Sequence, residues 1–328
     1  MSDIVTCPLA TLFSGKTEVD AKGGRYAIHH AAPMDQKGHF VTTILLGANG
    51  KLGLMLAAFA RLNSVEWRTQ ARSGAADITW SGLFDDPSVD EVFQRGSTII
   101  NMIGATRGDD AQLHDTNVGF VKTLLEKAAE TGVAHVVLVS SAAAYGAGGA
   151  DPFTEDTPLN PLTPYGKSKA TMERVTMEFA ANNNRPAITI ARIGNVAGAD
   201  ALTAAAKRHI SAGTEMPLHQ LSDGSAPIRS YIGPRDLFLA MKALSDPHDG
   251  PPRVVNVVHP QPVGLDEVLS AYQNHVLPDL KWAGTPAPDG TPQSVVLSAE
   301  TLQSIVKLEK YDDPAYSLGQ QVAEYLAQ

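Results

Sequence analysis

The spacing of hydrophobic residues changes repeatedly along residues 42–194. Short runs typical of buried strands fall at residues 42–46, 64–71, 78–80, 98–102, 136–140 and 187–193. Between several of them lie segments in which apolar residues recur every three or four positions, most clearly at residues 53–62, 117–130 and 165–183. Strands that alternate with helices predict an α/β fold built on a doubly wound parallel sheet.

The second part of the chain is less regular. Beyond about residue 195 the pattern breaks up and proline is more frequent, while residues 254–258 read as one more strand that returns to the sheet. We therefore expect residues 41–194 to form the doubly wound domain and residues 195–328 to form mainly a smaller lobe. Residues 1–40 precede the first predicted strand as an N-terminal extension.

A glycine-rich turn follows the first predicted strand and leads directly into a helical pattern. Glycines at such a turn let the backbone approach a pyrophosphate, and the N-terminus of the next helix offers free N–H groups to the anion. This order predicts a Rossmann-like, NAD(P)-binding domain. The turn residues expected at the cofactor are Gly47, Asn49, Gly50, Lys51, Leu52 and Gly53. A turn that only packs a helix on a strand is the structural alternative.

Tyr165 and Lys169 provide candidate chemistry. They are four residues apart in a helical segment, so their side chains share one face. An ammonium beside a phenol favours the ionised phenol, which makes tyrosine a workable proton-transfer group near neutral pH. The same spacing is common on amphipathic helices, but here a dinucleotide motif lies upstream. We predict that Tyr165, assisted by Lys169, is a general acid/base beside a nicotinamide.

The end of the second predicted strand bears on the choice of cofactor. An Asp or Glu at this place accepts hydrogen bonds from the ribose of NAD, whereas an arginine holds the 2′-phosphate of NADP. Here the acid position is Ala71, and Arg72 follows it. We therefore predict that NADP is favoured over NAD, with Arg72 on the phosphate. Arg72 as a solvated loop residue, and Glu66 or Asp77 as the acid, stay open without the strand register.

Composition narrows the class of protein. A chain of 328 residues can bury a large core, and a net charge of −9 argues against a nucleic-acid partner. The single cysteine, Cys7, excludes an internal disulfide and suits a reducing cytoplasm. No apolar run approaches the ~18 residues that cross a bilayer, and the histidines lack metal-binding spacing. We expect a cytoplasmic protein that binds no metal, membrane or nucleic acid.

Five segments, in order, resemble the extended short-chain dehydrogenase/reductase family, also called the NAD(P)-dependent epimerase/dehydratase family. They are the glycine turn, residues 100–104, residues 117–128, residues 137–146, and the pair Tyr165 and Lys169. The resemblance implies that Ile103 and Gly104 contact the cofactor and that Lys169 also binds the nicotinamide ribose. It implies that Ser141, with Ser140 as a nearby competitor, binds the reacting oxygen. It further implies a homodimer formed by the helices at residues 117–130 and 165–183.

The resemblance extends to a small-molecule substrate. Residues 192–198 and 228–232 are similar to segments with which sugar-nucleotide epimerases hold the substrate diphosphate, which implies that Asn195 and Arg229 bind substrate. The second half would then form the substrate-binding lobe. Sugar-nucleotide 4,6-dehydratases carry an Asp-Glu pair after the catalytic Ser or Thr, whereas Ala142 and Ala143 stand there in this chain. Alanine cannot move a proton, so this dehydration is not expected.

Three functions are compatible with these residues. The first is epimerisation of a nucleotide-sugar, in which one carbon is oxidised and reduced again with a retained cofactor. The second is an NADPH-dependent reductase of a ketone or keto-sugar, which Arg72 favours. The third is a non-catalytic NADP-binding sensor or scaffold, and the intact pair Tyr165 and Lys169 argues against it.

Overall fold

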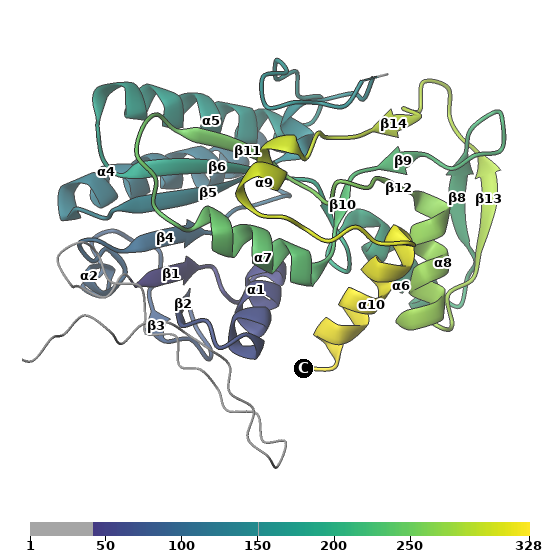
Figure 1. The fold of residues 1–328 in the computed structure, drawn as a ribbon, viewed down its shortest axis with the longest axis horizontal. Helices are drawn as coiled ribbons and strands as arrows, with labels where there is room; N and C mark the ends of the chain where they lie inside the picture. Colours follow the sequence, from purple (N-terminus) through teal and green to yellow (C-terminus); the bar gives the residue numbers. More distant parts are fainter. Residues whose placement is uncertain (1–41, 150) are drawn as a thin grey trace, which may run out of the picture.

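A seven-stranded parallel sheet forms the centre of the molecule (Figure 1). The computed structural model describes residues 42–149 and 151–328, so the N-terminal extension, residues 1–40, lies outside the described residues. In spatial order the strands are β11 (Arg253–Val257), β6 (Ala187–Ile193), β5 (His135–Ser141), β4 (Thr98–Asn101), β1 (Thr43–Leu46), β2 (Trp67–Ala71) and β3 (Ile78–Thr79). The predicted doubly wound parallel sheet is confirmed.

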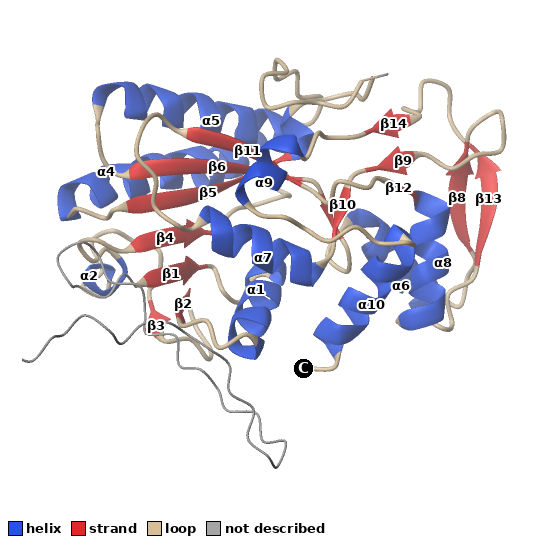
Figure 2. Cartoon of the chain, viewed as in Figure 1, coloured by secondary structure: helices blue, strands red, loops and turns tan. Residues whose placement is uncertain are grey.

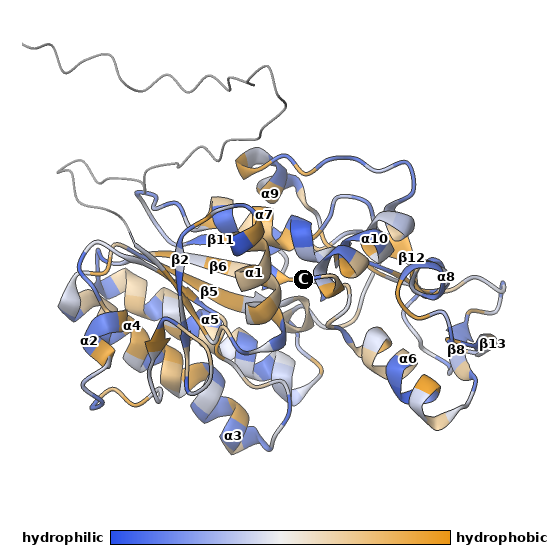
Figure 3. Ribbon diagram, turned by 90° about the horizontal axis from the view of Figure 1, so that it is seen from below, coloured by the Kyte–Doolittle hydropathy of each residue, from blue (hydrophilic) through white to orange (hydrophobic). Residues whose placement is uncertain are grey.

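Helices cover both faces of this sheet (Figure 2). They are α1 (Lys51–Leu62), α2 (Val89–Val92), α3 (Asp110–His114), α4 (Phe120–Thr131), α5 (Pro164–Asn182), α7 (Pro234–Leu244) and α9 (Glu300–Ile305). Successive strand residues point to opposite faces, so Leu45 of β1 packs with α1 and α7, whereas Ile44 and Leu46 pack with α4. Figure 3 shows β5 between these layers as mainly hydrophobic.

The remaining elements form a smaller lobe beside the carboxyl ends of the central strands (Figure 1). Its helices and strands are α6 (Ala201–Ala212), α8 (Leu265–His275), α10 (Pro314–Leu326), β7 (Asn195–Val196), β8 (Met216–Gln220), β9 (Ile228–Arg229), β10 (Tyr231–Ile232), β12 (Val263–Gly264), β13 (Trp282–Pro286) and β14 (Ser294–Val295). Tyr272 of α8 and Leu318 of α10 lie in an apolar cluster of the lobe. Within residues 42–149 and 151–328, no helix is long and apolar enough to cross a membrane.

Pairing of two subunits through the helices at residues 117–130 and 165–183 stays a prediction. On α5, Met172 is buried against the sheet, whereas Met177 is 42% exposed. An exposed methionine on an outer helix suits a partner helix but does not require one.

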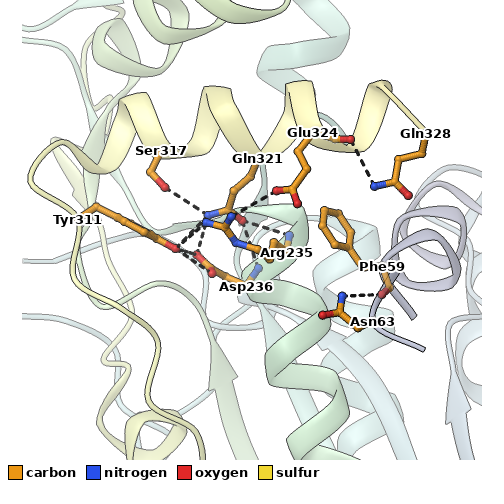
Figure 4. Close-up of polar contacts among 9 residues, drawn as sticks. All are labelled: Phe59, Asn63, Arg235, Asp236, Tyr311, Ser317, Gln321, Glu324 and Gln328. Atoms are coloured by element: carbon orange, nitrogen blue, oxygen red, sulfur yellow. Dashed lines mark hydrogen bonds and ion pairs between the residues drawn. The ribbon is translucent and has the colours of Figure 1, made fainter. Parts of the chain in front are cut away.

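A polar contact between α7 and α10 joins the sheet to the lobe (Figure 4). The side-chain oxygen of Gln321 accepts hydrogen bonds from the backbone N–H groups of Arg235, at 3.1 Å, and Asp236, at 3.2 Å. The Gln321 amide then donates to the Asp236 carboxylate at 2.9 Å, and the Tyr311 hydroxyl donates to the same carboxylate at 3.0 Å. The first turn of α7, which has no side-chain cap from Gly233, is therefore capped by a residue of α10.

Replacing Gln321 by alanine should lower the free energy of unfolding by about 1–3 kcal/mol, because two N–H groups would lose their acceptor and the buried Asp236 carboxylate would keep only Tyr311 as a donor. Urea unfolding followed by circular dichroism would measure the loss. Glu324→Ala is the matched control on the same helix, since it removes an ion pair to Arg235 whose side chains are 41% exposed; its cost should be about 0–1 kcal/mol. Equal losses in the two variants would contradict this account.

Candidate active site

The glycine turn after β1 has the geometry that a pyrophosphate site requires. Gly47 has a φ of +73°, in the left-handed region that favours glycine, and its carbonyl accepts a hydrogen bond from Gly50 N–H at 2.9 Å. A Cβ at Gly53 would lie 2.3 Å from that carbonyl oxygen, so only glycine lets α1 approach this closely. The N-cap residue of α1 is Gly50, which has no side chain to cap the helix. The N–H groups of its first turn therefore suit an anion.

A continuous cleft runs along the carboxyl ends of the central strands. One part, of about 680 Å³, lies beside β2, and the other, of about 770 Å³, lies beside α5 and the lobe. The two parts share Gly50, Ile103 and Gly104. The predicted cofactor residues that line one part or the other are Gly47, Asn49, Gly50, Lys51, Leu52, Gly53, Arg72, Ile103, Gly104, Tyr165 and Lys169. These glycines, free helix N–H groups and cleft dimensions fit a dinucleotide.

Tyr165 reaches this cleft because α5 begins close to the end of β5. Thr163 caps the helix by accepting a hydrogen bond from Gly166 N–H at 3.0 Å, and Pro164 occupies the first turn. A Cβ at Gly166 would lie 2.3 Å from the Ala143 carbonyl oxygen. Glycine at this position therefore allows the start of α5 to lie against the segment that follows Ser141.

A hydrogen bond to β5 holds the Lys169 side chain in place. Its ammonium donates to the Val139 carbonyl at 2.8 Å, and its Nζ lies 6.0 Å from the centre of the Tyr165 ring. Only 5% of the residue is exposed. Burial lowers the pKa of the Lys169 ammonium to about 8, while the nearby Glu173 carboxylate raises it by a smaller amount.

The pKa of Tyr165 differs from the sequence-based expectation. Burial raises the pKa of the phenol above its usual value, and hydrogen bonding with the Ser141 hydroxyl lowers it by less. The expected lowering by Lys169 is not found in this structure. Loss of water around the phenol outweighs an ammonium that is 6.0 Å away and bound to a backbone carbonyl.

Ser140 and Ser141 are adjacent in the sequence but have different hydrogen-bond partners. Ser140 is 1% exposed, and its hydroxyl donates to the Glu173 carboxylate of α5. Ser141, two residues after the cleft residue Val139, projects to the same side as Val139. Its hydroxyl accepts a hydrogen bond from Ala143 N–H at 3.2 Å. Neither serine lines the cleft itself, and of the two only Ser141 has its hydroxyl at the Tyr165 phenol.

Asn117 is a buried residue next to the cleft residue Gly104, and its role was not predicted. It lies in a π-helical turn, Asp115–Gly119, so the predicted helix at residues 117–130 begins as a wide turn before α4. Its amide accepts from Ala105 N–H at 2.9 Å and donates to the Ala105 carbonyl and the Ser168 hydroxyl. Asn117 therefore fixes the loop after β4 against α5. A buried asparagine inside an apolar helical pattern is the signal that could have revealed it.

The two predicted substrate residues are placed differently. Asn195 lines the cleft, and its amide donates to the Ser230 carbonyl at 3.1 Å. Arg229 does not line the cleft, because its guanidinium donates to the carbonyls of Ile228, at 2.8 Å, and Pro292, at 3.2 Å. Arg107, which no motif indicated, is the arginine that lines the cleft beside Tyr165. Within the described parts of the chain, no three His, Cys, Asp or Glu side chains gather as metal ligands would.

A Rossmann-like sheet with a glycine turn and a Tyr–Lys pair in one cleft is typical of one class of NAD-dependent enzymes. Residues 43–257 match the NAD dependent epimerase/dehydratase family, and the chain belongs to this family. UDP-glucose 4-epimerase of Lactobacillus helveticus is 30% identical over 163 residues, which are 49% of this chain and 48% of that protein. The chain thus spans about half the length of this relative.

Solved structures share the fold at low identity. The UDP-Glc/GlcNAc 4-epimerase of Campylobacter jejuni superposes with a TM-score of 0.71 and 21% identity, covering 87% of this chain and 98% of that one. An NAD-dependent NDP-hexosamine 5,6-dehydratase superposes with a TM-score of 0.70 and 20% identity, covering 88% and 98%. Epimerases and dehydratases therefore share this architecture, and the fold alone does not separate their reactions.

Gly53→Ala should weaken NADH binding, because the added Cβ would push α1 away from the Gly47 carbonyl, at a cost of about 1–3 kcal/mol for overpacking. Gly119→Ala is the control, since a Cβ there meets no described atom within 4 Å. Fluorescence titration with NADH would compare the two variants. Native affinity in Gly53→Ala would contradict the assignment of this turn to the pyrophosphate.

Proposed function

We propose that this protein epimerises a nucleotide-sugar by transient oxidation of one sugar carbon. The observation that carries the proposal is that Tyr165 and Lys169 line the cleft that the glycine turn also lines, with the Ser141 hydroxyl beside the Tyr165 phenol. Relatives named as UDP-glucose 4-epimerases support the substrate class. The proposal needs no further protein group, since one acid/base and a retained hydride carrier suffice for epimerisation.

The proposed proton and hydride movements balance within the site. A bound oxidised nicotinamide would accept the hydride, return it, and by its positive charge favour the ionised form of Tyr165. Tyr165 would take the proton of the sugar hydroxyl while the carbon loses its hydride and becomes a ketone. After the sugar turns its other face, the carbon regains the hydride and Tyr165 returns the proton to the oxygen. No net oxidation results.

Ser141 and Lys169 have supporting roles in this proposal. Ser141 would donate a hydrogen bond to the reacting oxygen, and Lys169 would hold the ribose of the cofactor and favour the phenolate of Tyr165. Asn195 would contact the substrate diphosphate from the lobe. Arg229 is left out of the proposed site, because backbone carbonyls already hold its guanidinium.

Dehydration is not part of the proposal. Ala142 and Ala143 follow Ser141 in a short 3₁₀ turn, and neither side chain can transfer a proton. These two residues, and not the fold, exclude dehydration from the proposal, because epimerases and dehydratases share the fold.

A second candidate is an NADPH-dependent reductase, and the end of β2 favours it. The Gln70 amide is occupied by Gly47 N–H and the Trp80 carbonyl, and Arg72 lines the cleft. Asp77 accepts hydrogen bonds from the backbone and hydroxyl of Thr69, at 2.7 Å each, and does not line the cleft. Because no acid of β2 takes the place of a ribose ligand, we propose that Arg72 binds a 2′-phosphate and that the cofactor is NADP.

Tyr165→Phe should reduce turnover roughly 10²–10⁴-fold with little change in cofactor affinity, because the ring keeps its packing and only the proton donor is lost. NMR of UDP-glucose and its 4-epimer would measure turnover, and fluorescence titration would measure cofactor binding. Tyr316→Phe is the matched control on the 45% exposed Tyr316 of α10. Full activity in Tyr165→Phe would show that another group moves the proton.

Arg72→Ala should weaken NADPH binding by about 1.5–3 kcal/mol and leave NADH binding unchanged, because only NADPH carries the phosphate. Arg68→Ala is the control, since Arg68 lies on β2, which Arg72 follows, but pairs with Glu91 at 3.5 Å. Parallel titrations with both dinucleotides would test this. If the native protein binds NADH as tightly as NADPH, Arg72 does not select NADP.

A further inference from the structure

A buried ion pair joins α5, the helix that carries Tyr165 and Lys169, to the neighbouring strand β6. The Glu173 carboxylate of α5 accepts hydrogen bonds from the Arg192 guanidinium of β6, from Nη2 at 2.7 Å and from Nε at 3.1 and 3.2 Å. The side chains of Arg192 and Glu173 are 7% and 6% exposed. The Ser140 hydroxyl of β5 donates to the same carboxylate. Three elements of the core therefore hold one carboxylate in place.

The other end of Arg192 is fixed as firmly. Its Nη1 donates to the Tyr145 hydroxyl at 2.8 Å and to the Glu155 carbonyl at 2.9 Å. Tyr145 in turn donates to the side-chain oxygen of Asn256 of β11 at 2.7 Å. A buried ion pair that loses one partner is costly, whereas this one has nearly all its hydrogen bonds satisfied. The position of the Glu173 carboxylate is thus set by β5, β6 and β11 together.

This carboxylate shares a helix face with the proposed site. Lys169 precedes Glu173 by four residues and Tyr165 precedes it by eight, so the three side chains follow one stripe of α5. Successive residues of β5 meet this stripe in turn: the Val139 carbonyl binds Lys169, and the Ser140 hydroxyl binds Glu173. Glu173 is therefore a fixed anion one helical turn along α5 from Lys169, a residue that is 5% exposed.

Several other charged or titratable groups surround Lys169. Those that face it or share its cleft and network are Tyr165 of α5, Arg192 of β6, Tyr145 after β5, Arg107 after β4, Lys51 of α1 and Asp200 before α6. Asp200 is engaged by Tyr231, at 2.5 Å, and by Thr203. The carboxylate of Glu173 is thus the buried anion on Lys169's own helix, and the cleft contributes the cations Lys51 and Arg107 as well.

We propose that Glu173, fixed by Arg192 and Ser140, is the counterion that keeps Lys169 charged and aimed at the cleft, and so acts as a positioning residue. The effect of Glu173 on the charge of Lys169 can be measured without substrate. The contribution of Glu173 to catalysis rests on the proposed function.

The test is a pH titration of Lys169 in protein labelled with ¹³C at the lysine Cε, its signal assigned with Lys169→Arg. In the native protein the midpoint should lie at about 8. In Glu173→Gln it should fall by roughly one pH unit, because the ammonium loses its anion. Ser140→Ala, which keeps the carboxylate, and Glu178→Gln, which removes an exposed carboxylate paired with Arg174 at 2.6 Å, should leave the midpoint unchanged. An unchanged midpoint in Glu173→Gln overturns the proposal.

Two further measurements keep the outcomes distinct. If Glu173→Gln fails to fold because Arg192 is left unpaired, the double variant Glu173→Gln/Arg192→Met removes both charges, and its Lys169 midpoint should still fall. The alkaline limb of the kcat/KM profile should move to lower pH with the midpoint, since activity that needs the ammonium is lost as pH rises through its pKa. A fallen midpoint with an unmoved limb would keep the counterion role and contradict the proposed role of Lys169 in turnover.

Discussion

The hydrogen bond from the Lys169 ammonium to the Val139 carbonyl joins the helix that carries Tyr165 to the strand that carries Ser141. The contact depends on a close approach of α5 to the end of β5, which Gly166 permits because any Cβ there would overlap the Ala143 carbonyl. The rest of the site follows from this approach. Residues of α5 line one side of the cleft, and residues of the glycine turn that follows β1 line another.

Burying a lysine at this place has an electrostatic cost, and the structure offsets it with few groups. Burial lowers the pKa of Lys169, and the opposing contribution comes from Glu173, whose own charge is balanced by Arg192. The phenol of Tyr165 lies in the same dry environment, and its pKa is raised. The pair therefore favours a protonated tyrosine beside a cationic lysine. The proposed reaction requires added positive charge in the cleft to shift this balance.

Patterns in the sequence predicted those parts of the fold and of the site that are determined by residues close together in the chain. The strand–glycine–helix order around Gly47 and the spacing of Tyr165 and Lys169 are of this kind, because a turn or one helix face determines them. Contacts between distant segments were not visible in the sequence. Examples are the capping of α7 by Gln321 and the carbonyl partners of Arg229. The pKa of Tyr165 was also mispredicted, because spacing along a helix does not reveal how deeply a phenol is buried.

The central claim is that a retained cofactor removes and returns the same hydride. UDP-glucose, UDP-N-acetylglucosamine and UDP-glucuronic acid, each deuterated at carbon 4, would be incubated with the protein and followed by NMR and mass spectrometry. The account predicts that one of them is converted to its 4-epimer with the deuterium retained and with no net oxidation of added NADPH. Loss of the deuterium from the product, or stoichiometric oxidation of NADPH without an epimer, would contradict it.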